Sequence, residues 1–93
     1  MTVIWSNRAF LTYDKVIDDL LIEWNPDIAE DFENRTRKLL DNLKVHSKLC
    51  PASKFKTLRK CVIHKNISMV YKLQGKSKIN IVAFIRSQSN HHF

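Results

Sequence analysis

The apolar residues of this chain change their spacing about half-way along it, and this change restricts the folds that it can adopt. In the first half they recur every three or four residues, which is the period of an α-helix. The spacing predicts two amphipathic helices, over about residues 7–24 and 26–45, with Ser6 or Asn7 capping the first. Asn25-Pro26-Asp27 interrupts the pattern, and so short a connection makes the helices fold back as an antiparallel hairpin. The apolar stripes are Phe10, Tyr13, Ile17, Leu20, Leu21 and Trp24, and then Ile28, Phe32, Leu39, Leu40 and Leu43.

The second half predicts a three-stranded antiparallel meander over about residues 57–85, because β-branched and aromatic runs alternate there with turn signals. The last two runs are apolar on both faces, which is typical of central strands, and a short run at residues 2–5 is expected to join the sheet. The expected fold class is α+β, in the order β-α-α-β-β-β, with a helical hairpin packed on a mainly antiparallel sheet of three or four strands. One domain is expected, with an irregular linker over residues 46–56 and a polar tail over residues 87–93. The three runs are residues 58–63, 67–73 and 79–85.

The acidic and basic residues are also divided unevenly between the two halves of the chain. Residues 1–41 hold all nine acidic side chains and five basic ones, a balance of 5 − 9 = −4. Residues 42–93 hold eleven basic side chains and no acid, so their +11 brings the whole chain to +7. Such a field attracts polyanions or acidic proteins, and it removes carboxylates as catalytic groups from half of the molecule.

Composition gives expectations about location and cofactors. No stretch is long or apolar enough for a membrane span or a secretory signal, and a cytoplasmic location is expected. In a reducing cytosol Cys50 and Cys61 would most often be free thiols, although a single bridge between them stays open. With His46 and His64 they also make four conceivable zinc ligands, but the ten-residue gap between the cysteines is unlike a structural zinc site. We expect no metal and no other cofactor.

The densest basic group lies where the linker passes into the meander. It contains Lys54, Lys56, Arg59 and Lys60, with Arg86 expected to converge on it from the end of the last strand. These side chains are candidates for binding a target or nucleic acid, and all but Lys60 are also candidates for stabilising charge at a scissile phosphate. Clustering of like charges lowers a lysine pKa, so one of them could act as a general base. The alternative is a solvated basic edge that keeps a strand from aggregating.

Two further kinds of side chain could take part in chemistry. His64, beside the basic group in the sequence, is a candidate acid or base near neutral pH, although a turn position also suits a histidine that does no chemistry. The periodic aromatics are expected in the core; a stacking platform for RNA would need basic and aromatic residues interleaved, and Tyr71-Lys72 is the one such pair. Those aromatics are Trp5, Tyr13, Trp24, Phe32 and Tyr71.

Five short motifs follow one another along the chain: Val3-Ile4-Trp5-Ser6, Leu39-Leu40-Asp41-Asn42-Leu43, Leu58-Arg59-Lys60, Ile67-Ser68-Met69-Val70-Tyr71-Lys72-Leu73 and Ile81-Val82-Ala83-Phe84-Ile85-Arg86. Taken in this order, they resemble the RelE/ParE superfamily of bacterial toxins from type II toxin-antitoxin systems, and the ParE-like branch most closely. The resemblance covers nearly the whole chain.

The resemblance implies a toxin that slows growth when free and is neutralised by a cognate antitoxin, through which it binds operator DNA indirectly. ParE-type members inhibit DNA gyrase, whereas RelE-type members are metal-independent endoribonucleases that cut mRNA on the ribosome. Ser68 stands where the RelE pattern expects arginine, and no tyrosine follows Arg86, so gyrase is the favoured target. The alternatives are the mRNA nuclease, a non-enzymatic nucleic-acid-binding module, and an inactive homologue that only partners the antitoxin.

Overall fold

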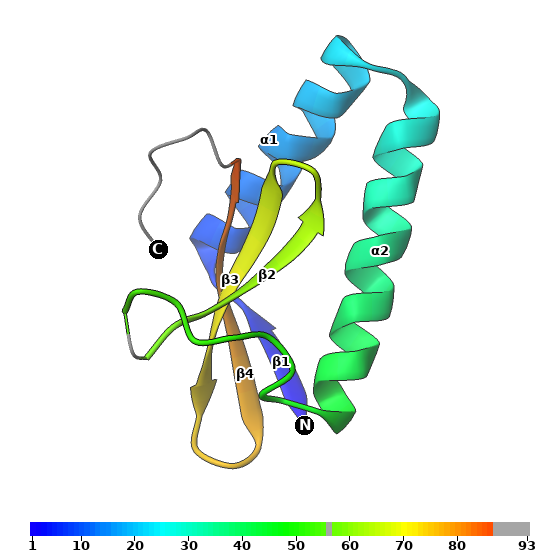
Figure 1. The fold of residues 1–93 in the computed structure, drawn as a ribbon. Coiled ribbons are helices and arrows are strands. Elements are labelled where there is room, and N and C mark those ends of the chain that lie inside the picture. The colour runs from blue at the N-terminus through cyan, green and yellow to red at the C-terminus, as the bar shows by residue number, and fades with distance from the viewer. Residues whose placement is uncertain (56, 87–93) are drawn as a thin grey trace.

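Six elements build the protein in the predicted order (Figure 1). The computed structural model describes residues 1–55 and 57–86, so Lys56 and the expected tail lie outside the described residues. The sheet order is β1-β4-β3-β2, with β1 parallel to β4 and the other pairs antiparallel, so β3 and β4 are central as predicted. The expected α+β class and element order are confirmed. The elements are β1 (Thr2–Trp5), α1 (Asn7–Glu23), α2 (Pro26–Val45), β2 (Arg59–His64), β3 (Ile67–Gln74) and β4 (Lys78–Arg86).

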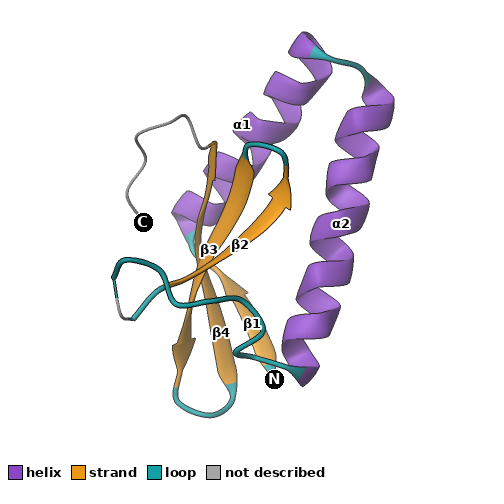
Figure 2. Cartoon of the chain, viewed as in Figure 1, coloured by secondary structure: helices purple, strands orange, loops and turns teal. Residues whose placement is uncertain are grey.

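Side-chain caps define where both helices begin. Ser6 Oγ accepts a hydrogen bond from the Ala9 N–H at 2.9 Å and donates one to the Val82 carbonyl at 2.9 Å, so the cap of α1 is also fastened to β4. Asn25 Oδ1 accepts from the Ile28 N–H at 3.0 Å, and Pro26 takes the first position of α2, where no N–H is needed. The two helices run antiparallel on one side of the sheet (Figure 2).

The main core lies between the helical hairpin and the sheet. Phe84 of β4 lies at its centre, with ring centroids 5.0 Å from Tyr13 and 5.3 Å from Trp5. Phe32 and Tyr71 are fully buried, as predicted. Trp24 is different, because its side chain is 66% exposed. It follows the last turn of α1 and is not covered by the sheet, so its predicted place in the core is wrong.

The buried face of α1 is also rotated from the predicted stripe. Its buried residues are Ala9, Val16 and Leu20, while Phe10 and Leu21 are 55% and 45% exposed. A narrow face therefore suffices to cover the sheet, and part of the predicted apolar stripe stays on the surface. No helix within the described residues is long and apolar enough to span a bilayer.

Cys50 and Cys61 are joined by a disulfide, with their Cα atoms 5.3 Å apart. The expectation that they are free thiols is therefore wrong, and the alternative left open by the sequence holds. The fold itself brings them together: the linker turns back so that Ala52 bridges Arg59, which places the segment around Cys50 beside β2. In this state neither sulfur is a thiolate able to bind zinc.

Candidate target-binding surface

The two layers of the molecule carry opposite charge. All nine acidic side chains lie on α1 and α2, which together hold six basic ones, a balance of 6 − 9 = −3. The segment that follows α2, residues 46–86, holds ten basic side chains and no acid, or +10, which completes the total of +7. The division seen along the sequence thus becomes a division between the helical layer and the sheet with its loops.

The face of the sheet that points away from the helices presents two lysines as neighbours. Alternation along β2 sends Cys61 and Ile63 into the main core and Lys60 and Val62 to the opposite face, where Val62 is 74% exposed. Lys60 is paired with Val70, so Lys72 is its diagonal neighbour on the same face. We call this surface the outer sheet face; it consists of Lys60, Val62, Ser68, Val70, Lys72, Asn80, Ala83 and Ile85.

Arg59 points away from that face and has a structural contact. Its Nη1 donates to the Cys50 carbonyl at 2.7 Å, with a second, longer approach of 3.5 Å to the Lys48 carbonyl. The guanidinium therefore holds the linker against the start of β2. Lys54 is exposed on the linker. Among the described residues of the predicted basic group, Lys54 and Lys60 therefore remain available to a partner.

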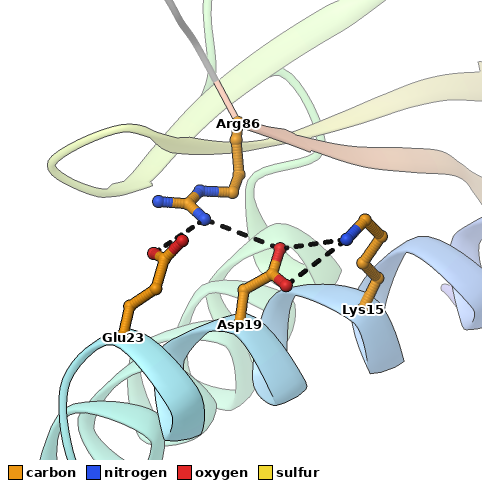
Figure 3. Close-up of polar contacts among 4 residues, drawn as sticks. All are labelled: Lys15, Asp19, Glu23 and Arg86. Atoms are coloured by element: carbon orange, nitrogen blue, oxygen red, sulfur yellow. Dashed lines mark hydrogen bonds and ion pairs between the residues drawn. The ribbon is translucent and has the colours of Figure 1, made fainter.

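Arg86 turns toward α1 instead of converging on the linker group (Figure 3). Its Nη1 lies 3.0 Å from Glu23 Oε2 and 3.5 Å from Asp19 Oδ2, and Asp19 also pairs with Lys15 at 3.3 Å. In the register, Arg86 is opposite Ile67 and Arg59 is opposite Tyr71, so four residues of β3, about 13 Å, separate them. The expected convergence is therefore wrong, since carboxylates on α1 attract this cation to the other layer.

Replacing Arg86 with glutamine is expected to lower the free energy of unfolding by about 1 kcal/mol, because the partly exposed ion cluster is screened by solvent. Urea unfolding in low and high salt measures the effect, which should shrink as salt rises. Lys44→Gln is the matched control, because Lys44 and Asp41 lie 4.0 Å apart and are well exposed. Equal losses in the two variants would contradict a special role for the Arg86 cluster.

His64 is also distant from the basic linker group. It is half-buried at the far end of β2 from Arg59, five residues or roughly 16 Å away. There it lines a cavity of about 110 Å³ with Trp24, Ile67 and Arg86. His64 is thus separated from the basic linker group beside which the sequence placed it.

Tyr71 anchors the linker from inside the core. Its side chain is fully buried and its hydroxyl donates to the Ser47 carbonyl at 2.8 Å. Burial raises the pKa of Tyr71, against smaller opposing effects of a backbone hydrogen bond and the Arg59 guanidinium. A buried, neutral phenol cannot stack on RNA bases, so the Tyr71-Lys72 pair does not form a stacking platform.

Alkaline solution should weaken the fold through Tyr71 and Tyr13, since burial raises both pKa values above 10.0. The contribution of these two raised pKa values to the free energy of unfolding is complete below pH 10.0. It is lost as pH rises through the folded-state pKa, because the phenols of the unfolded chain ionise first. Tyr71→Phe should cost about 1 kcal/mol at neutral pH by leaving the Ser47 carbonyl unpaired, yet lose stability less steeply in alkali. The measurement is the free energy of unfolding of both proteins as a function of alkaline pH. If it falls equally steeply in the variant and in the unaltered protein, Tyr71 is not a source of the alkaline loss.

This arrangement suits binding better than acid–base catalysis. On the outer sheet face Val70, Ala83 and Ile85 are buried, so the accessible side chains are those of Lys60, Val62, Lys72 and Asn80, with no carboxylate or histidine among the described residues. Sequence reasoning missed Lys72 as a member of the surface, although its position two residues beyond the partner of Lys60 would have revealed it once the register was known. A cationic, partly apolar face on a small α+β scaffold is the class of site that the fold defines.

Comparison with known proteins identifies the family. Residues 3–91 match the family described as ParE toxin of type II toxin-antitoxin system, parDE, and the chain belongs to that family. A cognate antitoxin is therefore implied as a partner. No curated protein matches the chain.

Solved structures share the fold at low sequence identity. A chain of the chromosomal ParDE toxin-antitoxin system from P. aeruginosa is 19% identical, with a TM-score of 0.76 over 95% of this chain and 97% of that chain. A copper-bound mutant toxin from Helicobacter pylori is 18% identical, with a TM-score of 0.63 over 92% and 93%. The YoeB/ParE toxin from Agrobacterium tumefaciens is 10% identical, with a TM-score of 0.65 over 95% and 100%.

Proposed function

We propose that this toxin arrests growth by inhibiting DNA gyrase, and that the outer sheet face carries its contacts with the target. The observation that carries the proposal is the pair Lys60 and Lys72 on an acid-free layer of a chain that belongs to the ParE toxin family. The two residues are diagonal neighbours on one face of the sheet, so their side chains can bind one acidic or phosphate-bearing patch together. A cytoplasmic target fits this proposal.

Ser68 favours gyrase over ribosome-bound mRNA. It occupies the outer sheet face, where the RelE pattern expects arginine, and its side chain is 2% exposed. The position therefore supplies neither a cation for the scissile phosphate nor an accessible hydroxyl. Because Tyr71 is buried and His64 lies at the far end of β2, the described part of this face also offers no histidine or tyrosine for proton transfer.

For the antitoxin we propose a second surface, on α1. Leu11 and Ile22 are 63% and 81% exposed, so α1 presents apolar side chains that a partner can cover. A groove of about 240 Å³ runs beside the same helix, between Val16 on α1 and Phe84 and Ile85 on β4. An antitoxin segment with apolar side chains fits this groove, and acidic residues farther along it would neutralise the sheet layer.

The test is induction of the protein alone in bacteria, with chromosomal DNA breaks and mRNA cleavage followed in the same culture. Growth arrest with DNA breaks and intact mRNA is expected, and coexpression of the protein encoded beside this gene should restore growth. Cleaved mRNA without DNA damage would assign the nuclease activity instead. Normal growth throughout would refute a toxin acting on either target.

A further inference from the structure

The disulfide lies at the base of the loop that leads into the candidate target-binding surface. Cys50 belongs to the linker and Cys61 to β2, next to Lys60, and their side chains are 7% and 3% exposed. Because β2 is an edge strand that pairs with β3 alone, the linker lies along an otherwise open side of the sheet. The bridge therefore ties this loop covalently to the strand that carries Lys60.

Tyr71 holds the start of the linker through the Ser47 carbonyl, which lies outside the segment that the bridge closes, and further hydrogen bonds lie within that segment. The Lys60 N–H donates to the Pro51 carbonyl at 3.2 Å, and the Ser53 N–H donates to the Leu58 carbonyl at 2.8 Å. Arg59 adds its hydrogen bond to the Cys50 carbonyl. These bonds form a short hairpin, and each depends on the linker remaining beside β2.

Apolar packing does little to keep the loop in place. Leu49 and Phe55 are 51% and 50% exposed, so the linker buries few large side chains of its own. Leu58 is the exception, since it packs against Val70 on the outer sheet face. When a loop has so little burial, the loss of its cross-link leaves it to open locally while the rest of the fold stays closed.

We propose that the Cys50–Cys61 pair is a redox switch: the disulfide form holds the linker hairpin and Lys60 in the target-binding arrangement, and reduction releases them. This inference rests on the proposed function of the outer sheet face. The reductant is a dithiol, such as the active site of a thiol–disulfide oxidoreductase. Its thiolate attacks one sulfur of the bridge and the other sulfur leaves as a thiolate that takes a proton; the second thiol of the reductant then resolves the mixed disulfide. The products are two protein thiols and one oxidised dithiol. Because the disulfide form is the one that binds the target, the toxin is most active in oxidising conditions.

The first arm of the test needs no knowledge of the target. Backbone amide exchange is compared between the oxidised protein and the same protein reduced with dithiothreitol. We expect the amides of Ser53 and Lys60 to exchange at least about tenfold faster after reduction, while those of Met69 and Ala83 in the central strands keep their protection. Unchanged exchange at Ser53 and Lys60 would overturn the switch, and so would loss of protection in the central strands, because the bridge would then hold the whole fold.

The second arm measures inhibition of supercoiling by purified DNA gyrase. The concentration of protein that halves the activity should rise about tenfold on reduction, and C50S/C61S should match the reduced protein with or without dithiothreitol. Equal inhibition by oxidised and reduced protein would overturn the switch. Absence of inhibition in both states would refute the proposed gyrase target, and the amide-exchange arm then decides whether the loop is redox-controlled.

Discussion

Exchanging Lys60 and Lys72 together for glutamine is expected to raise the concentration needed to inhibit gyrase by about 100-fold. The two lysines are diagonal neighbours on β2 and β3, and each can donate a charge-assisted hydrogen bond to one acidic patch. Such a bond contributes about 1.5–3 kcal/mol, and every 1.4 kcal/mol is a factor of ten in affinity. Growth arrest on induction should disappear in parallel.

The matched control for this pair removes two positive charges from the helical layer. Lys38→Gln with Lys44→Gln changes exposed residues of α2 and leaves the outer sheet face intact. This control should alter inhibition by less than about threefold, through the general field alone. Circular dichroism establishes that both variants are folded. Similar weakening by the two pairs would mean that overall charge, and not the outer sheet face, determines target binding.

Truncating Phe32 to alanine should cost about 3–5 kcal/mol of unfolding free energy, because its ring is fully buried. The ring packs between the centroids of Tyr13 at 5.6 Å and Phe84 at 6.2 Å, so the variant leaves a cavity where α2 meets the sheet. Small domains have total stabilities of about 5–15 kcal/mol, and this loss would leave much of the variant unfolded at growth temperature.

Trp24→Ala is the comparison that isolates burial from aromatic character. The larger ring of Trp24 is 66% exposed, and its removal should change the free energy of unfolding by less than about 0.5 kcal/mol. Denaturant unfolding of both variants measures the difference. A loss for Trp24→Ala comparable to that for Phe32→Ala would show that the tip of the helical hairpin is packed in solution.

Local patterns were enough to predict the element order. The helices follow from residues spaced by three and four, and the Ser6 and Asn25 caps show why each helix begins where it does. The strands follow from β-branched runs with Gly75 in the turn between β3 and β4, where its φ of 61° suits a residue without a side chain. These features depend on neighbours in the sequence, so one chain suffices to predict them.

The site depends on register, which local patterns do not contain. Arg86 follows a predicted strand, but its contacts are set by α1, which carries Asp19 and Glu23 past the end of β4. Lys72 becomes a neighbour of Lys60 only through the pairing of β2 with β3. Cys50 and Cys61 meet because the linker returns along β2. In each case residues distant in the sequence determine the contact.

Supercoiling of relaxed plasmid by purified gyrase, in the presence of the oxidised protein, tests the central claim most directly. A parallel reaction contains translating ribosomes with a defined mRNA. We expect supercoiling to stop while the mRNA remains whole, and the Lys60 and Lys72 double variant to leave supercoiling active. Uninhibited gyrase together with mRNA cut on the ribosome would contradict the account and make the outer sheet face a nuclease surface.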